Sequence, residues 1–203
     1  RRCRRFGASL MLPLLLQHVE AQGFATFDGG HAYNLNIVGI RSTNAAAGNF
    51  DDAIACAYRK TIGGAWHVKY WPATTDAGKF WLSNPLDVDG TAILKEGQYR
   101  GAYVLGRHRG QYEALTQAEP VTVWRDNNRD YILDRFEGSE QTGLYGINIH
   151  KAGVRSSLVG RWSAGCQVFA RAADFDQLIE LCHKQIASNP TWRPRFTYTL
   201  LEL

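Results

Sequence analysis

The sequence has few cysteines, a single methionine and no long apolar segment. Its four cysteines are scattered through 203 residues, which argues against a disulfide-linked scaffold and against a zinc site built from cysteine pairs. The longest apolar run, Leu10 to Leu16, is far shorter than the roughly 18 residues of a membrane-spanning helix. There is no phosphate-binding P-loop and no dinucleotide-binding glycine fingerprint. We therefore expect no metal, no cofactor and no membrane span.

The excess of positive charge lies at the beginning of the chain. The net charge is +4, and four of the first five residues are arginine. Met11, the only methionine, is a candidate start, so we interpret residues 1–10 as a tail and residues 11–203 as one domain. A cleavable secretion signal is the alternative for this segment. Without the four arginines the remaining charges balance, so we expect no nucleic-acid partner.

Short apolar runs separated by Gly, Asn and Asp predict a mainly β fold of the α+β class, either a β-sandwich or a partly closed barrel. A short helix is expected between Pro13 and Gly23. A second helix is expected to begin at Asp174, which forms a capping box with Gln177. The predicted strands are 33–40, 53–58, 66–71, 79–82, 103–105, 121–124, 131–133 and 144–150.

A strand that ends at His150 is followed 16 residues later by Cys166. Because side chains alternate along a strand, Ile147 and Ile149 are expected in the core, and Asn148 and His150 on the opposite face. The intervening loop is long enough to return the chain to the same end of the sheet, where thiol and imidazole can meet. A neighbouring histidine converts a protonated thiol into a thiolate nucleophile. The pair is therefore a candidate nucleophile and base.

The segment Ser163-Ala164-Gly165-Cys166 predicts a tight turn before the thiol. Glycine permits such a turn and the close approach of a substrate. The backbone amides of Gly165 and Cys166 are candidate donors to a developing oxyanion. From the residues alone, a glycine-flanked cysteine is more often structural than catalytic, so both interpretations stay open at this point.

The run from His150 to Ser163-Ala164-Gly165-Cys166 resembles the active-site signature of the L,D-transpeptidase catalytic-domain family, in which a strand-borne histidine precedes Ser/Thr-His-Gly-Cys. A weaker resemblance of the strand pattern extends over residues 35–185. The resemblance implies a β-rich catalytic domain with a helix after the nucleophile. It also implies that the cysteine attacks the carbonyl between the L-centre and the D-amino acid of a peptidoglycan stem peptide.

Residue by residue, the resemblance assigns Cys166 as the nucleophile and His150 as the base, with a nearby backbone carbonyl orienting the ring. Ser163 and Gly165 become the residues that shape the nucleophile turn. The chain departs from the signature at three positions. Ala164 stands where histidine is usual, and Lys151 replaces the glycine that usually follows the base. Val168 stands where arginine or asparagine is expected. These departures indicate a divergent member of the family.

The missing polar residue after the cysteine leaves recognition of the substrate carboxylate unassigned. Arg161 is the first candidate replacement, and the arginines of the 106–110 loop are others; solvated loop charges are the alternative. Asn148 and His108 are further candidate substrate-binding residues. Transfer to an amine and hydrolysis by water both stay open.

The leading hypothesis is thus a cysteine acyl-transfer enzyme, an L,D-transpeptidase or an L,D-carboxypeptidase or endopeptidase, with a peptidoglycan stem peptide as its partner. The alternative is a catalytically inactive cell-wall-binding or virion-structural module with the same fold. Either hypothesis places the protein in the bacterial periplasm or cell envelope, or in a phage-associated role. The sequence does not determine the oligomeric state.

One further motif has the spacing of a calcium loop. Its oxygen ligands would be the Ile132 carbonyl at position 7 and the side chains at positions 1, 3, 5, 9 and 12, which are Asp126, Asn128, Asp130, Asp134 and Glu137. Position 6 is Tyr131 rather than the glycine of such loops, and β-like runs flank the segment. We therefore favour a polar hairpin turn as the interpretation of this segment.

Overall fold

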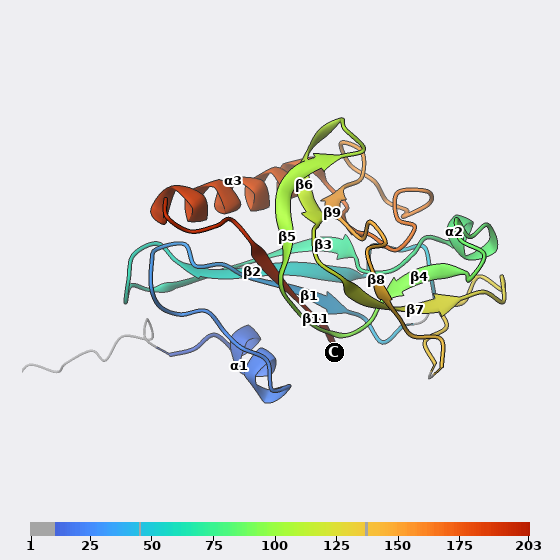
Figure 1. Cartoon of the computed structure of the whole chain (residues 1–203), viewed down its shortest axis with the longest axis horizontal. Helices are drawn as coiled ribbons and strands as arrows, with labels where there is room; N and C mark the ends of the chain where they lie inside the picture. The colour runs from blue at the N-terminus through green and yellow to red at the C-terminus, as the bar shows by residue number, and fades with distance from the viewer. Residues whose placement is uncertain (1–10, 45, 137) are drawn as a thin grey trace, which may run out of the picture.

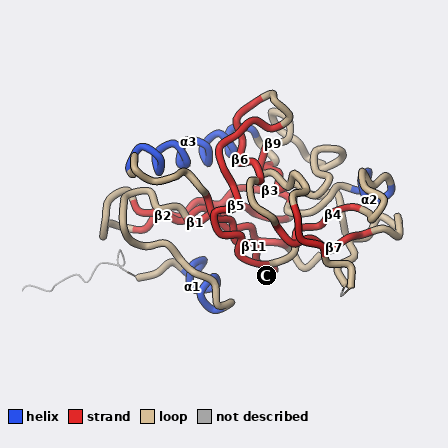
Figure 2. Tube along the Cα trace, viewed as in Figure 1, coloured by secondary structure: helices blue, strands red, loops and turns tan. Residues whose placement is uncertain are grey.

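The computed structural model describes residues 11–44, 46–136 and 138–203, so the predicted tail 1–10 lies outside the described residues. The fold is α+β and mainly β, as predicted (Figure 1, Figure 2). Its helices are α1 (Leu14–Ala21), α2 (Lys79–Ser83) and α3 (Ala172–Ser188). Its strands are β1 (Asn36–Arg41), β2 (Asp52–Arg59), β3 (Trp66–Thr74), β4 (Thr91–Leu94), β5 (Gly97–His108), β6 (Tyr112–Gln117), β7 (Val121–Asp126), β8 (Gln141–Gly143), β9 (Ile149–Lys151), β10 (Gln167–Phe169) and β11 (Phe196–Glu202).

Of the two predicted arrangements, the structure has the barrel, and the barrel is closed. In the described part of the chain it runs in the order β1-β11-β5-β6-β9-β10-β3-β2, and a separate sheet has the order β4-β7-β8. Most neighbours are antiparallel, but β1 pairs with β11 and β9 with β10 in parallel. The parallel pair β9 and β10 matters most for function, because it aligns the segments that carry His150 and Cys166.

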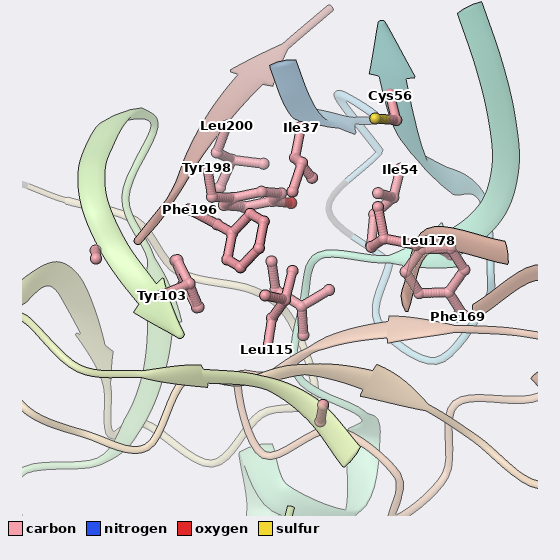
Figure 3. Close-up of a cluster of buried hydrophobic side chains, with 14 of the residues drawn as sticks. Ile37, Ile54, Cys56, Tyr103, Leu115, Phe169, Leu178, Phe196, Tyr198 and Leu200 are labelled. Atoms are coloured by element: carbon pink, nitrogen blue, oxygen red, sulfur yellow. The ribbon is translucent and has the colours of Figure 1, made fainter. Parts of the chain in front are cut away.

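The barrel is filled by apolar side chains from opposite walls, shown in Figure 3. Ile37, Ile54 and Cys56 enter from β1 and β2, and Leu115 enters from β6. Helix α3 contributes Leu178 and the fully buried Cys182 to the same cluster. Cys56 and Cys182 are therefore both core thiols. Apolar burial holds helix α3 beside the barrel.

Helix α1 covers the outer face of the barrel. The alternation of strand side chains sends Ile37 inward and Val38 outward, where Val38 meets Leu16 and Val19 of the helix. Figure 1 shows α1 and α3 on opposite sides of the strands. Among the described helices, none is both long and apolar enough to cross a membrane.

Helix α3 begins earlier than predicted. Its N-cap is Arg171, whereas Asp174 lies in the first turn and accepts a 2.6 Å hydrogen bond from Arg171. Gln177 accepts a hydrogen bond from Lys69 of β3 instead of closing a capping box. The capping prediction was wrong because the Asp174 side chain pairs with Arg171 and the Gln177 side chain pairs with Lys69.

Two predicted strands were also wrong. Residues 79–82 form α2, in which Leu82 is fully buried, because a short apolar run does not distinguish strand from helix by periodicity. Residues 131–133 form no strand: Tyr131 has a φ of 70°, and Ile132 makes only an isolated bridge to Ala46. The predicted strand 144–150 forms a strand only from Ile149. The backbone before it is not extended, because Gly146 has a φ of 71°.

Candidate active site

His150 lies in the middle of β9, and Cys166 immediately precedes the neighbouring strand β10. The register pairs His150 with Val168, so the segment before β9 lies beside the segment before β10. The backbone amide of Asn148 donates to the Cys166 Sγ at 3.4 Å, and the thiol donates to the Gly146 carbonyl at 3.4 Å. The two predicted catalytic residues are therefore brought to one end of the same parallel pair.

The turn before Cys166 is held by Ser163 and Gly165. The buried Ser163 hydroxyl donates to the Cys166 carbonyl at 2.7 Å and accepts from the Gly165 amide at 3.1 Å. Gly165 has a φ of 120°, and a Cβ there would lie 2.2 Å from the Ala92 carbonyl oxygen. Both residues thus shape the turn, but the Gly165 amide is already engaged. Of the two predicted oxyanion donors, only the Cys166 amide has no hydrogen-bond partner among the described residues.

Backbone and hydroxyl groups fix the orientation of the His150 ring. Its Nδ1 lies 2.9 Å from the Lys151 carbonyl oxygen, an acceptor that requires the proton to sit on Nδ1. The Tyr112 hydroxyl donates to the same carbonyl at 3.1 Å and lies 3.3 Å from Nδ1. This tautomer leaves the lone pair on Nε2, the nitrogen that a general base uses.

The Nε2 atom of His150 is buried and has no hydrogen-bond partner among the described residues. It makes no hydrogen bond with Cys166, whose thiol is directed to the Gly146 carbonyl. Catalytic hydrogen bonds often form only when a substrate is bound. The strand register brings the two residues onto neighbouring strands, and the unpartnered Nε2 is the candidate proton acceptor.

Burial keeps both groups neutral. It lowers the pKa of His150 to about 3, and the neighbouring His108 lowers it as well, while the Lys151 carbonyl opposes the shift. Burial raises the pKa of the Cys166 thiol to about 11, with the Asn148 amide opposing. The resting site therefore contains a thiol and a neutral imidazole rather than a thiolate–imidazolium pair.

His108 and Asn148 pack beside His150, the candidate base. The His108 ring stacks on His150 with a centroid distance of 4.0 Å. The Asn148 side chain donates to His108 Nδ1 at 3.2 Å and accepts from the Gln117 amide at 2.9 Å. The two residues thus form a connected group against the His150 ring, and a role for them in substrate binding stays a prediction.

A pocket of about 260 Å³ opens beside the nucleophile turn and is lined by residues that include Trp81, Gly90, Thr91, Arg125, Tyr145 and Ala164. The Arg125 guanidinium lies 4.7 Å from the Tyr145 ring centroid and 3.7 Å from the Asp87 carboxylate. The pocket thus combines aromatic surface with one cation and one anion. A larger hollow of about 550 Å³ is lined by residues that include Asn49 and Arg155. None of the predicted site residues lines either hollow, and the smaller one is nearest to them through Ala164.

Arg161, the first candidate for carboxylate recognition, does not line this pocket. Its guanidinium stacks on Phe80 at 3.8 Å, and its carbonyl accepts from the Trp81 indole at 3.1 Å. Sequence reasoning missed Arg125 because a charged residue at the end of a strand carries no motif. It also gave no role to Tyr112, whose position after the turn of the 106–110 loop brings its hydroxyl to His150.

In residues 11–44, 46–136 and 138–203, no three acidic, histidine or cysteine side chains are gathered closely enough to hold an ion. No protein-family model, no curated protein and no solved structure matches this chain.

Proposed function

We propose that this protein is a cysteine acyl-transfer enzyme of the L,D-transpeptidase type, acting on peptidoglycan stem peptides. The observation that carries the proposal is the arrangement of two residues: Cys166 before β10, and His150 on β9 with its Nδ1 fixed by the Lys151 carbonyl. This arrangement agrees with the order, spacing and carbonyl-oriented histidine of the family that the sequence resembles.

The chemistry follows from the protonation states. As Cys166 Sγ attacks the substrate carbonyl carbon, the thiol proton passes to His150 Nε2, and a carbon–sulfur bond forms. The Cys166 amide donates to the oxygen on which negative charge develops. When the carbon–nitrogen bond breaks, His150 returns the proton to the departing amine. An acceptor amine or a water molecule then attacks the thioester and releases Cys166.

The pocket beside Ala164 supports a peptide substrate with charged ends. Arg125 uses Nε on Gln141 and one terminal nitrogen on the Gly90 carbonyl, which holds the guanidinium at the pocket wall. Its other terminal nitrogen lies near Asp87, so the wall offers partners to a carboxylate and to an ammonium group. We assign carboxylate recognition to Arg125 in place of Arg161.

The test is to incubate the protein with a defined tetrapeptide muropeptide and to measure its intact mass. We expect an adduct that equals the acyl tripeptide fragment, mapped to Cys166, and release of the terminal D-amino acid. Cys166→Ala and His150→Ala should abolish the adduct or its turnover. Cys56→Ala is the matched control, because it removes a thiol that lies in the core.

The inactive wall-binding module makes the opposite prediction. It retains binding to muropeptides but gives no adduct and no released amino acid, even after long incubation. Full turnover by Cys166→Ala with native circular dichroism would also reject the proposed enzyme, because it would assign the chemistry to another group.

A further inference from the structure

The connection from β7 to β8 presents oxygen atoms at a regular spacing. Asp126 ends β7, and Asn128, Asp130 and Asp134 follow at positions 3, 5 and 9 of the twelve-residue pattern. We propose that this loop is a calcium-binding site. Glu137, at position 12, lies outside the described residues, so the proposal rests on the first nine positions.

The backbone conformation removes the main sequence argument against such a site. A calcium loop needs a sharp turn at position 6, which glycine normally provides. Tyr131 occupies this position with a φ of 70° and projects an exposed ring, and Arg129 has a φ of 65°. The loop therefore makes the required turn without glycine. It joins the antiparallel strands β7 and β8, as expected for the polar hairpin turn that the sequence favoured.

The side chains of the pattern are turned toward the loop's own backbone. The Asp126 carboxylate accepts from the Asp134 amide at 3.1 Å, and the Asp130 carboxylate accepts from the Ile132 amide at 2.8 Å. The Asn128 carbonyl oxygen accepts from the Asp130 amide at 3.1 Å. Each of these hydrogen bonds engages one side-chain oxygen and holds that side chain against the loop backbone.

One carboxylate oxygen in this loop is buried without a hydrogen-bond partner in the described part of the chain. Asp126 is fully buried, and its Oδ1 has no hydrogen-bond partner among the described residues. Burying an unpaired carboxylate oxygen is costly, and a cation is the partner that offsets this cost most directly. This oxygen is independent of the sequence spacing and points to a missing positive ligand.

The Asn128 amide nitrogen now lies between the other two carboxylates. It donates to Asp130 Oδ2 at 3.0 Å and to Asp134 Oδ2. The acidic side chains are consequently not yet gathered around a single point, and binding requires the amide group to turn away as they close on the ion. Mixed carboxylate, amide and carbonyl oxygens in an irregular loop suit Ca²⁺ better than Mg²⁺, which demands near-octahedral geometry.

The test is calorimetric titration of the intact chain with CaCl₂ after dialysis against a chelator. We expect one site with a dissociation constant of about 10⁻⁵ to 10⁻³ M, weakened at least about tenfold in Asp130→Asn and in Asp134→Asn. Asp28→Asn is the matched control, because Asp28 is also exposed and loses only its ion pair with Arg59. It should bind calcium as the wild type does.

Terbium luminescence gives a second measurement on the unmodified chain. Tyr131 belongs to the loop, so excitation of tyrosine should sensitise a bound Tb³⁺, and Ca²⁺ should displace the ion. Absence of calcium binding at about 10 mM, equal binding by the Asn variants, or displacement of Tb³⁺ by Mg²⁺ as readily as by Ca²⁺ would each overturn the proposal. These measurements report binding alone, so their outcome is independent of the chemistry at Cys166.

Discussion

The rings of His108 and His150 stack with centroids 4.0 Å apart and an angle of 22° between their planes. Two protonated imidazoles at this distance would repel each other strongly, so at most one ring of the stack is protonated. Burial and this neighbour together lower the pKa of His150, which preserves the lone pair on Nε2. The stack is thus a device that keeps the candidate base unprotonated.

We predict that the rate at which iodoacetamide alkylates Cys166 depends on pH as expected for a thiol with an unusually high pKa. The rate should rise about tenfold for each pH unit between about pH 7 and about pH 10, because burial raises the pKa to about 11 and the thiolate is the reactive form. Mass spectrometry after partial labelling measures each site separately. Cys56 and Cys182, which are fully buried, should label far more slowly. A constant rate at low pH would instead indicate a thiolate–imidazolium pair.

We predict that His108→Ala raises the pKa of His150 toward its ordinary value of 6.5. The substitution removes a repulsive neighbour and admits water, and both changes favour the protonated ring. Histidine NMR titration measures the shift directly. His18→Ala is the control, because His18 is an exposed residue of α1. An unchanged His150 titration would show that the stack does not control its protonation.

The same pKa predicts how stability depends on pH. In the folded protein the His150 pKa is about 3, below its ordinary value of 6.5, so the unfolded chain binds the proton more readily. The stabilising contribution of His150 to the free energy of unfolding is therefore fully present above pH 6.5 and is lost as the pH falls toward 3. Urea titrations across this range should show the loss in the wild type and a smaller loss in His108→Ala.

We predict that Gly165→Ala destabilises the fold. The new Cβ would lie 2.2 Å from the Ala92 carbonyl oxygen, and the φ of 120° is unfavourable for any other residue. The expected loss is at least about 1 to 3 kcal/mol, measured by urea denaturation. Gly29→Ala provides the comparison, since a Cβ there meets nothing within 4 Å. Equal stability of the two variants would contradict the role of Gly165 in the turn.

We predict that Ala164→Phe blocks the pocket without inactivating the thiol. Ala164 lines the pocket beside the nucleophile turn, so a phenyl ring there should exclude a peptide and raise KM or abolish muropeptide turnover. Alkylation of Cys166 by a small reagent should continue at the wild-type rate. Ala164→Ser, which adds one atom, should retain turnover. If Ala164→Phe turns over muropeptides normally, the substrate binds elsewhere.

The sequence by itself determined the mainly β class, the apolar face of α3 and the core position of Ile147 and Ile149. These are consequences of local periodicity, because residues that recur on one face of an element are buried together. The same alternation placed Asn148 and His150 on one face. The spacing to Cys166, with glycine before it, made the pair a candidate, and the roles of nucleophile and base came from the resemblance to a family.

Only the tertiary structure decided the environment of these residues. The Tyr112 hydroxyl reaches His150 through the pairing of distant strands, and Arg125 lines the pocket beside Ala164 in the same way; local patterns encode neither contact. Burial likewise depends on the closed barrel, and it is burial that makes the thiol and imidazole neutral. The sequence thus selected which groups could react, and packing between distant segments set their orientation and their charge.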